Sequence, residues 1–317
     1  MQIPTELLNA VQHNSSRDPS PAVSLLVEEI LSRYGDAVRA ILFYGSCLHK
    51  GEDLNGLFDL YVLVDTYDSV NKNSMLAALN KLLPPNVFYL EVPCNGQTVR
   101  AKYAILSLGD LQKGTSRNWF HSYLWARFCQ PTVMVYVRDE KIKNQVNIAF
   151  AQAVITFVTR VLPRLQPRFS IRELWQKGLE LSYKAEFRPE RPDQQVRLYD
   201  ATPDYFNDIT CMALSSSPYQ VTIGMEEKTT ICHAEISARK RLLCRMTWAI
   251  RIIQGKALSV LRLVKGTLTF EGGVDYILWK IKRHSGVTME ASPFLRRHPL
   301  LAMCVLSWRL YRRGGVQ

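Results

Sequence analysis

Five short apolar runs, bounded by turn residues, lie between residues 37 and 137 of this 317-residue chain. Helical periodicity dominates from about residue 139 onward. The runs have the length of buried or half-buried strands, and they lie at 37–44, 57–64, 87–92, 99–106 and 132–137. The remaining apolar spacing predicts helices within 1–35 and near 70–82, 117–128, 139–162, 170–187, 203–215, 232–253 and 271–284, with a loop at 215–230. Strands followed by helices predict an α+β protein. We expect a mixed-sheet domain at 1–137, a helical domain at 138–238 and a basic, amphipathic helical region at 239–317.

The composition excludes several classes of protein. Hydrophobic residues make up 47% of the chain and aromatic residues 10%, which is enough for a sizeable core and excludes disordered and fibrous chains. No run reaches the roughly 18 consecutive apolar residues of a membrane-spanning helix, so we do not expect an integral membrane protein. The first residues carry neither a secretory signal pattern nor a transit-peptide pattern, which predicts a cytoplasmic protein.

The positive charge is concentrated at one end of the chain. From Arg239 to Gln317 there are 16 Lys and Arg against three acidic residues, a net charge of +13, whereas the 238 preceding residues carry −1. Such an end attracts nucleic acid or an anionic membrane surface. Bulky aliphatic residues are interleaved with basic ones in 239–265, and arginines flank an apolar run at 300–308, a pattern typical of helices in the lipid headgroup region. Nucleic acid is the less favoured partner because base-reading side chains are sparse here. A packed helical core with a solvated basic face is the alternative.

The candidate chemistry lies at the first two expected strands. Gly45 and Ser46 follow the first strand, and Asp59 lies inside the second. A glycine turn lets the backbone approach a polyphosphate, a serine hydroxyl can bond its oxygens, and a carboxylate on the neighbouring strand can hold Mg²⁺. This layout is typical of nucleotidyltransferases, although a Gly-Ser pair is also a common turn.

A second metal ligand is harder to assign. Many such enzymes have another carboxylate two residues along the strand, on the same face, and that position is Tyr61 here. Asp65 shares the face but lies six residues from Asp59, roughly 20 Å along an extended strand. Glu91, in the third expected strand, is therefore the candidate second ligand. The alternative for Glu91 is a glutamate on an edge strand that faces water.

A longer series of motifs, from about residue 40 to 190, resembles the mitochondrial-type phosphatidate cytidylyltransferases, the translocator assembly and maintenance family. In chain order the matching residues are Phe43-Tyr44-Gly45-Ser46, Phe58-Asp59, Val64-Asp65, Val92-Pro93-Cys94-Asn95-Gly96, Lys102-Tyr103, Asn118-Trp119, Arg127, Pro131 and Leu181-Ser182-Tyr183. Glu186 and Arg188 follow, where the family usually has Asp and Arg. Each motif is modest, and their ordered succession is the specific feature. That family also tends to lack the second strand carboxylate, in agreement with Tyr61.

The resemblance implies a bacterial homologue of these enzymes, peripheral on the inner face of the cell membrane. Such an enzyme makes CDP-diacylglycerol from CTP and phosphatidic acid, with Mg²⁺ as cofactor and release of pyrophosphate. Together with the strand pattern it assigns catalytic groups (Asp59, Lys102, Arg127), nucleotide-binding residues (Tyr44, Gly45, Ser46), substrate-binding residues (Tyr183, Glu186, Arg188) and metal ligands (Asp59, Glu91). Residues 239–317 would then dock on the anionic membrane that holds the lipid.

Two other functions fit the same residues. The chain could be a nucleotidyltransferase that acts on RNA or a small alcohol, in which case RNA binding would be salt-sensitive and independent of vesicles. It could also be a non-catalytic adaptor at a membrane surface that retains a degenerate nucleotidyltransferase fold. At the level of single residues, Lys102 and Arg127 could form surface ion pairs, and Tyr183 could belong to the core.

Overall fold

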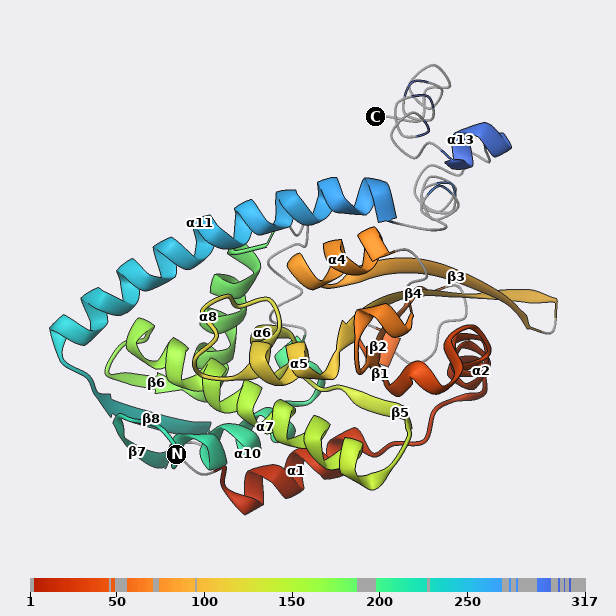
Figure 1. Ribbon diagram of the computed structural model, residues 1–317. Helices are drawn as coiled ribbons and strands as arrows, with labels where there is room; N and C mark the ends of the chain where they lie inside the picture. The colour runs from red at the N-terminus through yellow and green to blue at the C-terminus, as the bar shows by residue number, and fades with distance from the viewer. Residues whose placement is uncertain are drawn as a thin grey trace. The chain divides into compact units, whose positions relative to one another are not determined.

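The computed structural model describes residues 3–45, 47–48, 56–70, 74–94, 96–186, 198–226, 229–269, 274, 278, 290–297, 302, 305 and 308 (Figure 1). The protein is of the α+β class, with a five-strand mixed sheet, a three-strand antiparallel sheet and a long C-terminal helix. The chain forms two compact units, each built from separated segments. Unit 1 contains Met1–Asp18, Arg39–Tyr44 and Ser107–Val260, and unit 2 contains Pro19–Val38, Gly45–Leu106 and Leu261–Gln317. The division into domains at 1–137, 138–238 and 239–317 stays a prediction.

The five-strand sheet consists of the five strands expected from the apolar runs. They are β1 (Val38–Tyr44), β2 (Phe58–Val64), β3 (Asn86–Cys94), β4 (Gln97–Ser107) and β5 (Val133–Val137). Their order is β3-β4-β2-β1-β5, with antiparallel pairing between β1 and β5 and between β3 and β4. Six of the seven residues of the central strand β2 are buried, as expected of an apolar strand covered on both faces. Asp59 is its one half-buried residue.

Two helices of unit 2 lie where the sequence predicts them. The first, α2 (Pro21–Tyr34), begins at the Ser20-Pro21 pair, and the Ser20 hydroxyl accepts a hydrogen bond from the Val23 amide near the helix start. Proline fits the first helical position because the amide that it lacks would have no partner within the helix. The second, α4 (Ser74–Leu82), occupies the expected stretch near 70–82.

Unit 1 is built around the long helix α7. This helix is α7 (Glu140–Val161), and the other α-helices of the unit that precede residue 238 are α1 (Thr5–Ser15), α5 (Leu108–Thr115), α6 (Trp125–Phe128), α8 (Ile171–Lys184) and α10 (Pro203–Leu214). The span Glu140–Arg164 is long and apolar enough to cross a membrane, but 78% of its most apolar 18-residue stretch is buried inside the protein. Phe157 of α7 stacks on Trp175 of α8 with ring centroids 4.5 Å apart. This packing is that of a core helix.

The prediction of a helix near 117–128 is wrong for the first two turns of that helix. Only α6 is helical there, and α5 ends just before this segment. The physical reason is that side chains, not helix amides, bind three carbonyl groups in the first part of the segment. Arg160 donates to the carbonyl oxygens of Arg117 and Trp119, and Arg251 donates to that of Phe120. These arginines come from distant parts of the chain, so local periodicity does not reveal them.

The second sheet was not expected. It has the order β6-β8-β7, from Arg168–Ser170, Thr229–Glu235 and Gln220–Glu226, and it replaces the expected loop at 215–230 and the first turn of the expected helix at 232–253. Six of the seven β7 residues are exposed, so this strand lacks the apolar signature of a buried one. Pairing with β8 along its whole length holds it in the sheet.

The C-terminal helix α11 begins later and runs further than expected, from Ala238 to Thr269, and Figure 1 shows it as one unbroken helix. A short helix, α13 (Pro293–Arg297), follows. Apart from Val274 and Leu278, the expected helix near 271–284 lies outside the described residues.

Candidate functional site

The structure brings Gly45 and Asp59 together. Gly45 follows the last residue of β1 with φ of +93°, a conformation that L side chains rarely adopt. A Cβ atom on Gly45 would lie 3.1 Å from Oδ2 of Asp59, so the missing side chain leaves the carboxylate directly beside the turn. Asp59 is held between the fully buried Phe58 and Leu60 of β2. The expected arrangement of a glycine turn beside a strand carboxylate is therefore present.

The turn is also tied to the start of β2. The Leu48 amide donates to the Gly45 carbonyl at 3.2 Å, and the Cys47 thiol donates to the Leu57 carbonyl at 3.2 Å. Leu57 immediately precedes β2, so Cys47 fixes the turn against the strand that carries Asp59. Sequence reasoning missed Cys47, because a lone thiol carries no signal of such a bond. Ser46 lies outside the described residues.

The described residues offer one carboxylate at this turn rather than a cluster. Tyr61, at the position of the usual second carboxylate, is fully buried and belongs to the core. Among the residues whose placement is described, no three His, Cys, Asp or Glu side chains gather in a way that could hold a metal ion. Mg²⁺ commonly binds to one or two carboxylates and takes its other ligands from water and substrate phosphates. Asp59 beside the Gly45 turn fits that mode of binding.

Glu91 and Lys102 lie on one face of the ribbon formed by β3 and β4. Glu91 pairs with Arg100 across the strands, with Oε1 3.0 Å from Nε, and accepts a 2.8 Å hydrogen bond from the Tyr89 hydroxyl. Burial and the nearby Glu91 carboxylate raise the pKa of Tyr89, so its phenol stays protonated and can donate. Lys102 is directly opposite Tyr89 in the ladder. Metal binding by Glu91 stays a prediction.

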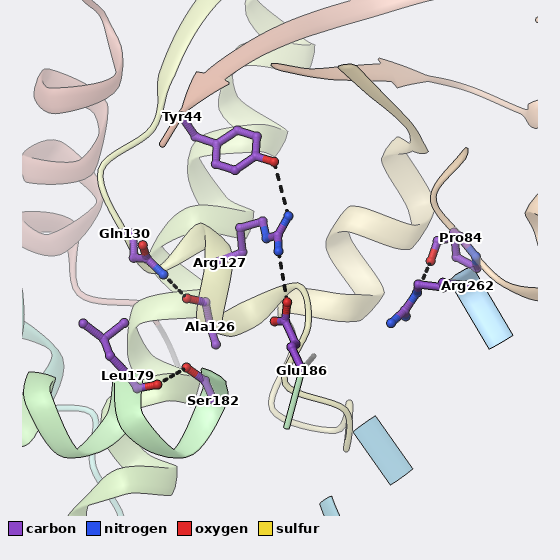
Figure 2. A network of polar contacts seen from close by, with 9 residues as sticks. All are labelled: Tyr44, Pro84, Ala126, Arg127, Gln130, Leu179, Ser182, Glu186 and Arg262. Atoms are coloured by element: carbon purple, nitrogen blue, oxygen red, sulfur yellow. Dashed lines mark hydrogen bonds and ion pairs between the residues drawn. The ribbon is translucent and has the colours of Figure 1, made fainter. Parts of the chain in front are cut away.

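A second cluster, in unit 1, unites three of the expected site residues around Arg127. Figure 2 shows its guanidinium between Tyr44 and Glu186. Nη1 of Arg127 donates to the Tyr44 hydroxyl at 3.2 Å, and Nη2 donates to Oε2 of Glu186 at 3.2 Å. The guanidinium also lies over the ring of Tyr123, 4.6 Å from its centroid. We call Tyr44, Tyr123, Arg127 and Glu186 the Arg127 cluster.

The ion pair of the Arg127 cluster is largely buried, whereas Tyr44 and Tyr123 are half-buried. The side chains of Arg127 and Glu186 are 12% and 9% exposed, so this is not the surface ion pair that was the alternative for Arg127. Buried charges of this kind are stable only when they are paired and hydrogen-bonded. The aromatic rings of Tyr44 and Tyr123 add cation–π attraction to the guanidinium.

Local backbone structure positions both members of the ion pair. Arg127 is in the one-turn helix α6 and lies four residues after Tyr123, which is in the turn that leads into α6 and whose ring lies beside the guanidinium. Glu186 follows the end of α8, and its amide donates to the Tyr183 carbonyl at 3.0 Å. Tyr183 thus supports Glu186 through its backbone, and its side chain is half-buried. Arg188 lies outside the described residues.

Tyr123 is a further residue that sequence reasoning missed. A signal was present, because Tyr123 and Arg127 are four residues apart, the spacing at which side chains meet on a helix. This spacing alone does not identify a functional pair, because aromatic residues are common in core segments and an expected helix at 117–128 contains several pairs at the same spacing.

Comparisons with known proteins add no identification. No protein-family model matches the chain, and no curated protein matches it.

Proposed function

We propose that the protein is a CTP:phosphatidate cytidylyltransferase that works at a membrane surface and belongs to the nucleotidyltransferase fold class. The observation that carries the proposal is the placement of the Asp59 carboxylate against Gly45, at a turn with positive φ. A carboxylate beside a glycine turn can hold Mg²⁺ together with the phosphates of a nucleotide. The motif resemblance, which spans about residues 40–190, selects CTP and phosphatidic acid as substrates.

The proposed reaction needs little acid or base chemistry. An oxygen of the phosphatidate phosphomonoester attacks the α-phosphorus of CTP and forms a new P–O bond. The bond from the α-phosphorus to the bridging oxygen of the β-phosphate breaks, and pyrophosphate leaves with the electron pair. Since the attacking oxygen is already ionised near neutral pH, no side chain has to remove a proton. Bound Mg²⁺ would neutralise charge on the phosphates.

In this proposal the residues of the chain bind and orient two polyanions. Gly45, and Ser46 with it, allow the triphosphate to approach the backbone, and Asp59 holds the metal. Arg127 offsets negative charge on the transferring phosphate, with Tyr44 and Glu186 keeping its guanidinium in place. Lys102 shares the role of catalytic group with Arg127. Tyr183 and Arg188 as substrate-binding residues, and Glu91 as second metal ligand, belong to the same proposal.

The lipid acceptor also requires access to a membrane. Phosphatidic acid stays in the bilayer, so the enzyme must reach an anionic surface. The excess positive charge of residues 239–317, +13 in all, supplies the attraction. We place the protein in a bacterial cytoplasm, peripheral on the inner face of the cell membrane.

The direct test incubates purified protein with CTP labelled in the α-phosphate and cytosine, Mg²⁺ and vesicles that contain phosphatidic acid. The expected result is a lipid-extractable product that carries CMP, with an equal amount of pyrophosphate, and with neither when lipid or Mg²⁺ is omitted. Parallel reactions with tRNA and with glycerol test the other nucleotidyltransferase functions. Transfer to one of these acceptors but not to phosphatidic acid would replace the proposed substrate. Intact CTP in every reaction would favour the non-catalytic adaptor.

A further inference from the structure

The helix α11 exposes a continuous apolar surface to solvent. Within unit 1 the exposed large apolar side chains of this helix are Leu242, Leu243, Met246, Ile250, Ile253 and Val260. Ile253 is 70% exposed and Ile250 58% exposed. Single exposed apolar residues are common on protein surfaces, but a contiguous group marks an interaction site. We call these six side chains the outward face of α11.

The outward face lies opposite the face by which α11 is packed. Residues two positions apart on a helix point to nearly opposite sides. Met246 and Ile250 are each two residues from Trp248, and Ile253 is two residues from Gly255. Trp248 and Gly255 are both buried in unit 1. The apolar side chains therefore do not complete the core of unit 1, and their exposure needs another explanation.

The charge of α11 indicates the partner. Between Ala238 and Thr269 the chain has eight Lys and Arg and no Asp or Glu. Exposed Arg239, Arg245 and Lys256 are each three or four residues from apolar side chains of the outward face, the spacing of neighbours on a helix, whereas Lys240 lies over the Tyr219 ring. A second copy of the same helix would bring like charges together, whereas an anionic bilayer would attract the basic residues and take up the apolar ones. Basic residues beside an apolar face are the usual composition of helices that lie in the membrane interface.

The packed side of α11 contacts the segments that carry the Arg127 cluster. The Arg251 side chain, 1% exposed, donates from Nε to the Phe120 carbonyl at 2.7 Å and lies over the Phe120 ring. Gly255 packs so closely on Ala185 that a Cβ atom there would lie 2.2 Å from the Ala185 carbonyl oxygen. Phe120 belongs to the segment that leads to Arg127, and Ala185 directly precedes Glu186. One side of the helix thus supports the cluster while the other side is free to meet a surface.

We infer that the outward face of α11 is the surface that docks on an anionic lipid bilayer. The inference deepens the proposed function, and it rests on that function for the identity of the partner. It assigns docking to a defined set of side chains instead of to the whole region 239–317. On a docked protein the apolar side chains enter the headgroup region, and Arg245 and Lys256 meet lipid phosphates.

The test measures co-sedimentation of the full chain with vesicles of equimolar phosphatidylcholine and phosphatidylglycerol. Phosphatidylglycerol supplies the anionic surface without the proposed substrate, so docking is measured apart from catalysis. The test variant carries Ile250→Gln and Ile253→Gln, because glutamine keeps helix propensity. The matched control carries Ile223→Gln and Met225→Gln, which remove exposed apolar side chains of β7 in the same unit.

We expect the wild-type chain and the β7 control to bind the anionic vesicles and to bind pure phosphatidylcholine much more weakly. The α11 variant should lose about tenfold or more in vesicle affinity, since two exposed isoleucines no longer enter the interface. Arg245→Gln with Lys256→Gln should lose about fivefold per charge, and the loss should shrink at high salt. Unchanged thermal unfolding temperatures would show that all variants fold.

Three results would overturn the inference. One is an equal loss of vesicle binding in the β7 control, and another is unchanged vesicle binding of the α11 variant. The third is concentration-dependent dimerisation of the wild-type chain that is lost in the α11 variant while vesicle binding persists. The last would mean that a second copy covers this face. Failure of the proposed function gives a different pattern, in which vesicle binding depends on the outward face as expected but no CMP is transferred to phosphatidic acid.

Discussion

The ion pair of the Arg127 cluster gives a prediction whose size follows from its burial. The charged atoms of Arg127 and Glu186 lie 3.2 Å apart with side chains 12% and 9% exposed. At an effective dielectric constant near 20, two unit charges about 4 Å apart attract by about 4 kcal/mol. Most of that attraction offsets the desolvation of the two groups, so the pair itself adds little net stability. Removing one partner is different, because the remaining charge stays buried.

We therefore expect Glu186→Gln to lower the free energy of unfolding by about 3 kcal/mol, near the low end for a broken buried pair, since the guanidinium keeps its contacts with Tyr44 and Tyr123. Arg127→Gln should cost a similar amount. The double variant should cost clearly less than the sum of the two, because no unpaired charge is left.

The assay is urea unfolding followed by tryptophan fluorescence for the wild-type chain, both single variants and the double variant. From this cycle we expect a coupling energy of about 2 kcal/mol. Glu186→Asp serves as the control, because it keeps the charge on a shorter arm and should cost less than Glu186→Gln. If the three costs are additive and each is below about 0.5 kcal/mol, the pair behaves like an exposed surface pair, and the reasoning from burial is refuted.

Three further predictions concern single sites. Gly45→Ala should cost about 1–2 kcal/mol of stability, measured by urea unfolding, and at least tenfold in CMP transfer, because it puts a side chain at positive φ and 3.1 Å from the Asp59 carboxylate. Gly255→Ala should cost about 1–3 kcal/mol in the same unfolding assay, because its Cβ would clash with the Ala185 carbonyl. Burial lowers the pKa of Lys265 to about 7 in the folded protein, below the value of a lysine in the unfolded chain. Between about pH 7 and 10 the unfolded chain therefore binds a proton at Lys265 that the folded protein has released, so the free energy of unfolding should rise with pH over this range. The difference in unfolding free energy between wild type and Lys265→Met should show this rise, and a difference that is flat or falls with pH would contradict it.

The elements that could be predicted from the sequence are those with a clear local pattern of apolar residues. All five strands of the first sheet were expected because their apolar runs are interrupted by turn residues, and α7 and α8 show clear helical periodicity. The second sheet was missed because β7 is exposed almost throughout and depends on pairing with β8. The irregular segment before α6 was missed because Arg160 and Arg251, distant in sequence, bind its carbonyl groups.

For the candidate site residues, too, contacts between near neighbours in the fold pattern could be predicted from the sequence, and contacts between distant segments could not. The adjacency of Gly45 and Asp59 follows from the order of strand, turn and strand, so it could be expected from sequence. The contact of Arg127 with Glu186 joins residues 59 positions apart, and only the motif resemblance suggested that both serve one site. The outward face of α11 needed the structure, because periodicity alone does not say which of two apolar helix faces is packed.

In the proposed function, the Asp59 carboxylate beside Gly45 supports metal-dependent transfer of CMP to phosphatidic acid. The most direct measurement compares the rate of that transfer in the wild-type chain, Asp59→Asn and Asp65→Asn, at saturating Mg²⁺ and with equal vesicle binding verified. Asp65 is a matched control, because it is an exposed aspartate directly after the same strand. We expect a loss of at least about a thousandfold for Asp59→Asn, equivalent to about 4 kcal/mol, and little change for Asp65→Asn. A folded Asp59→Asn variant with wild-type activity, or an equal loss in both variants, would contradict it.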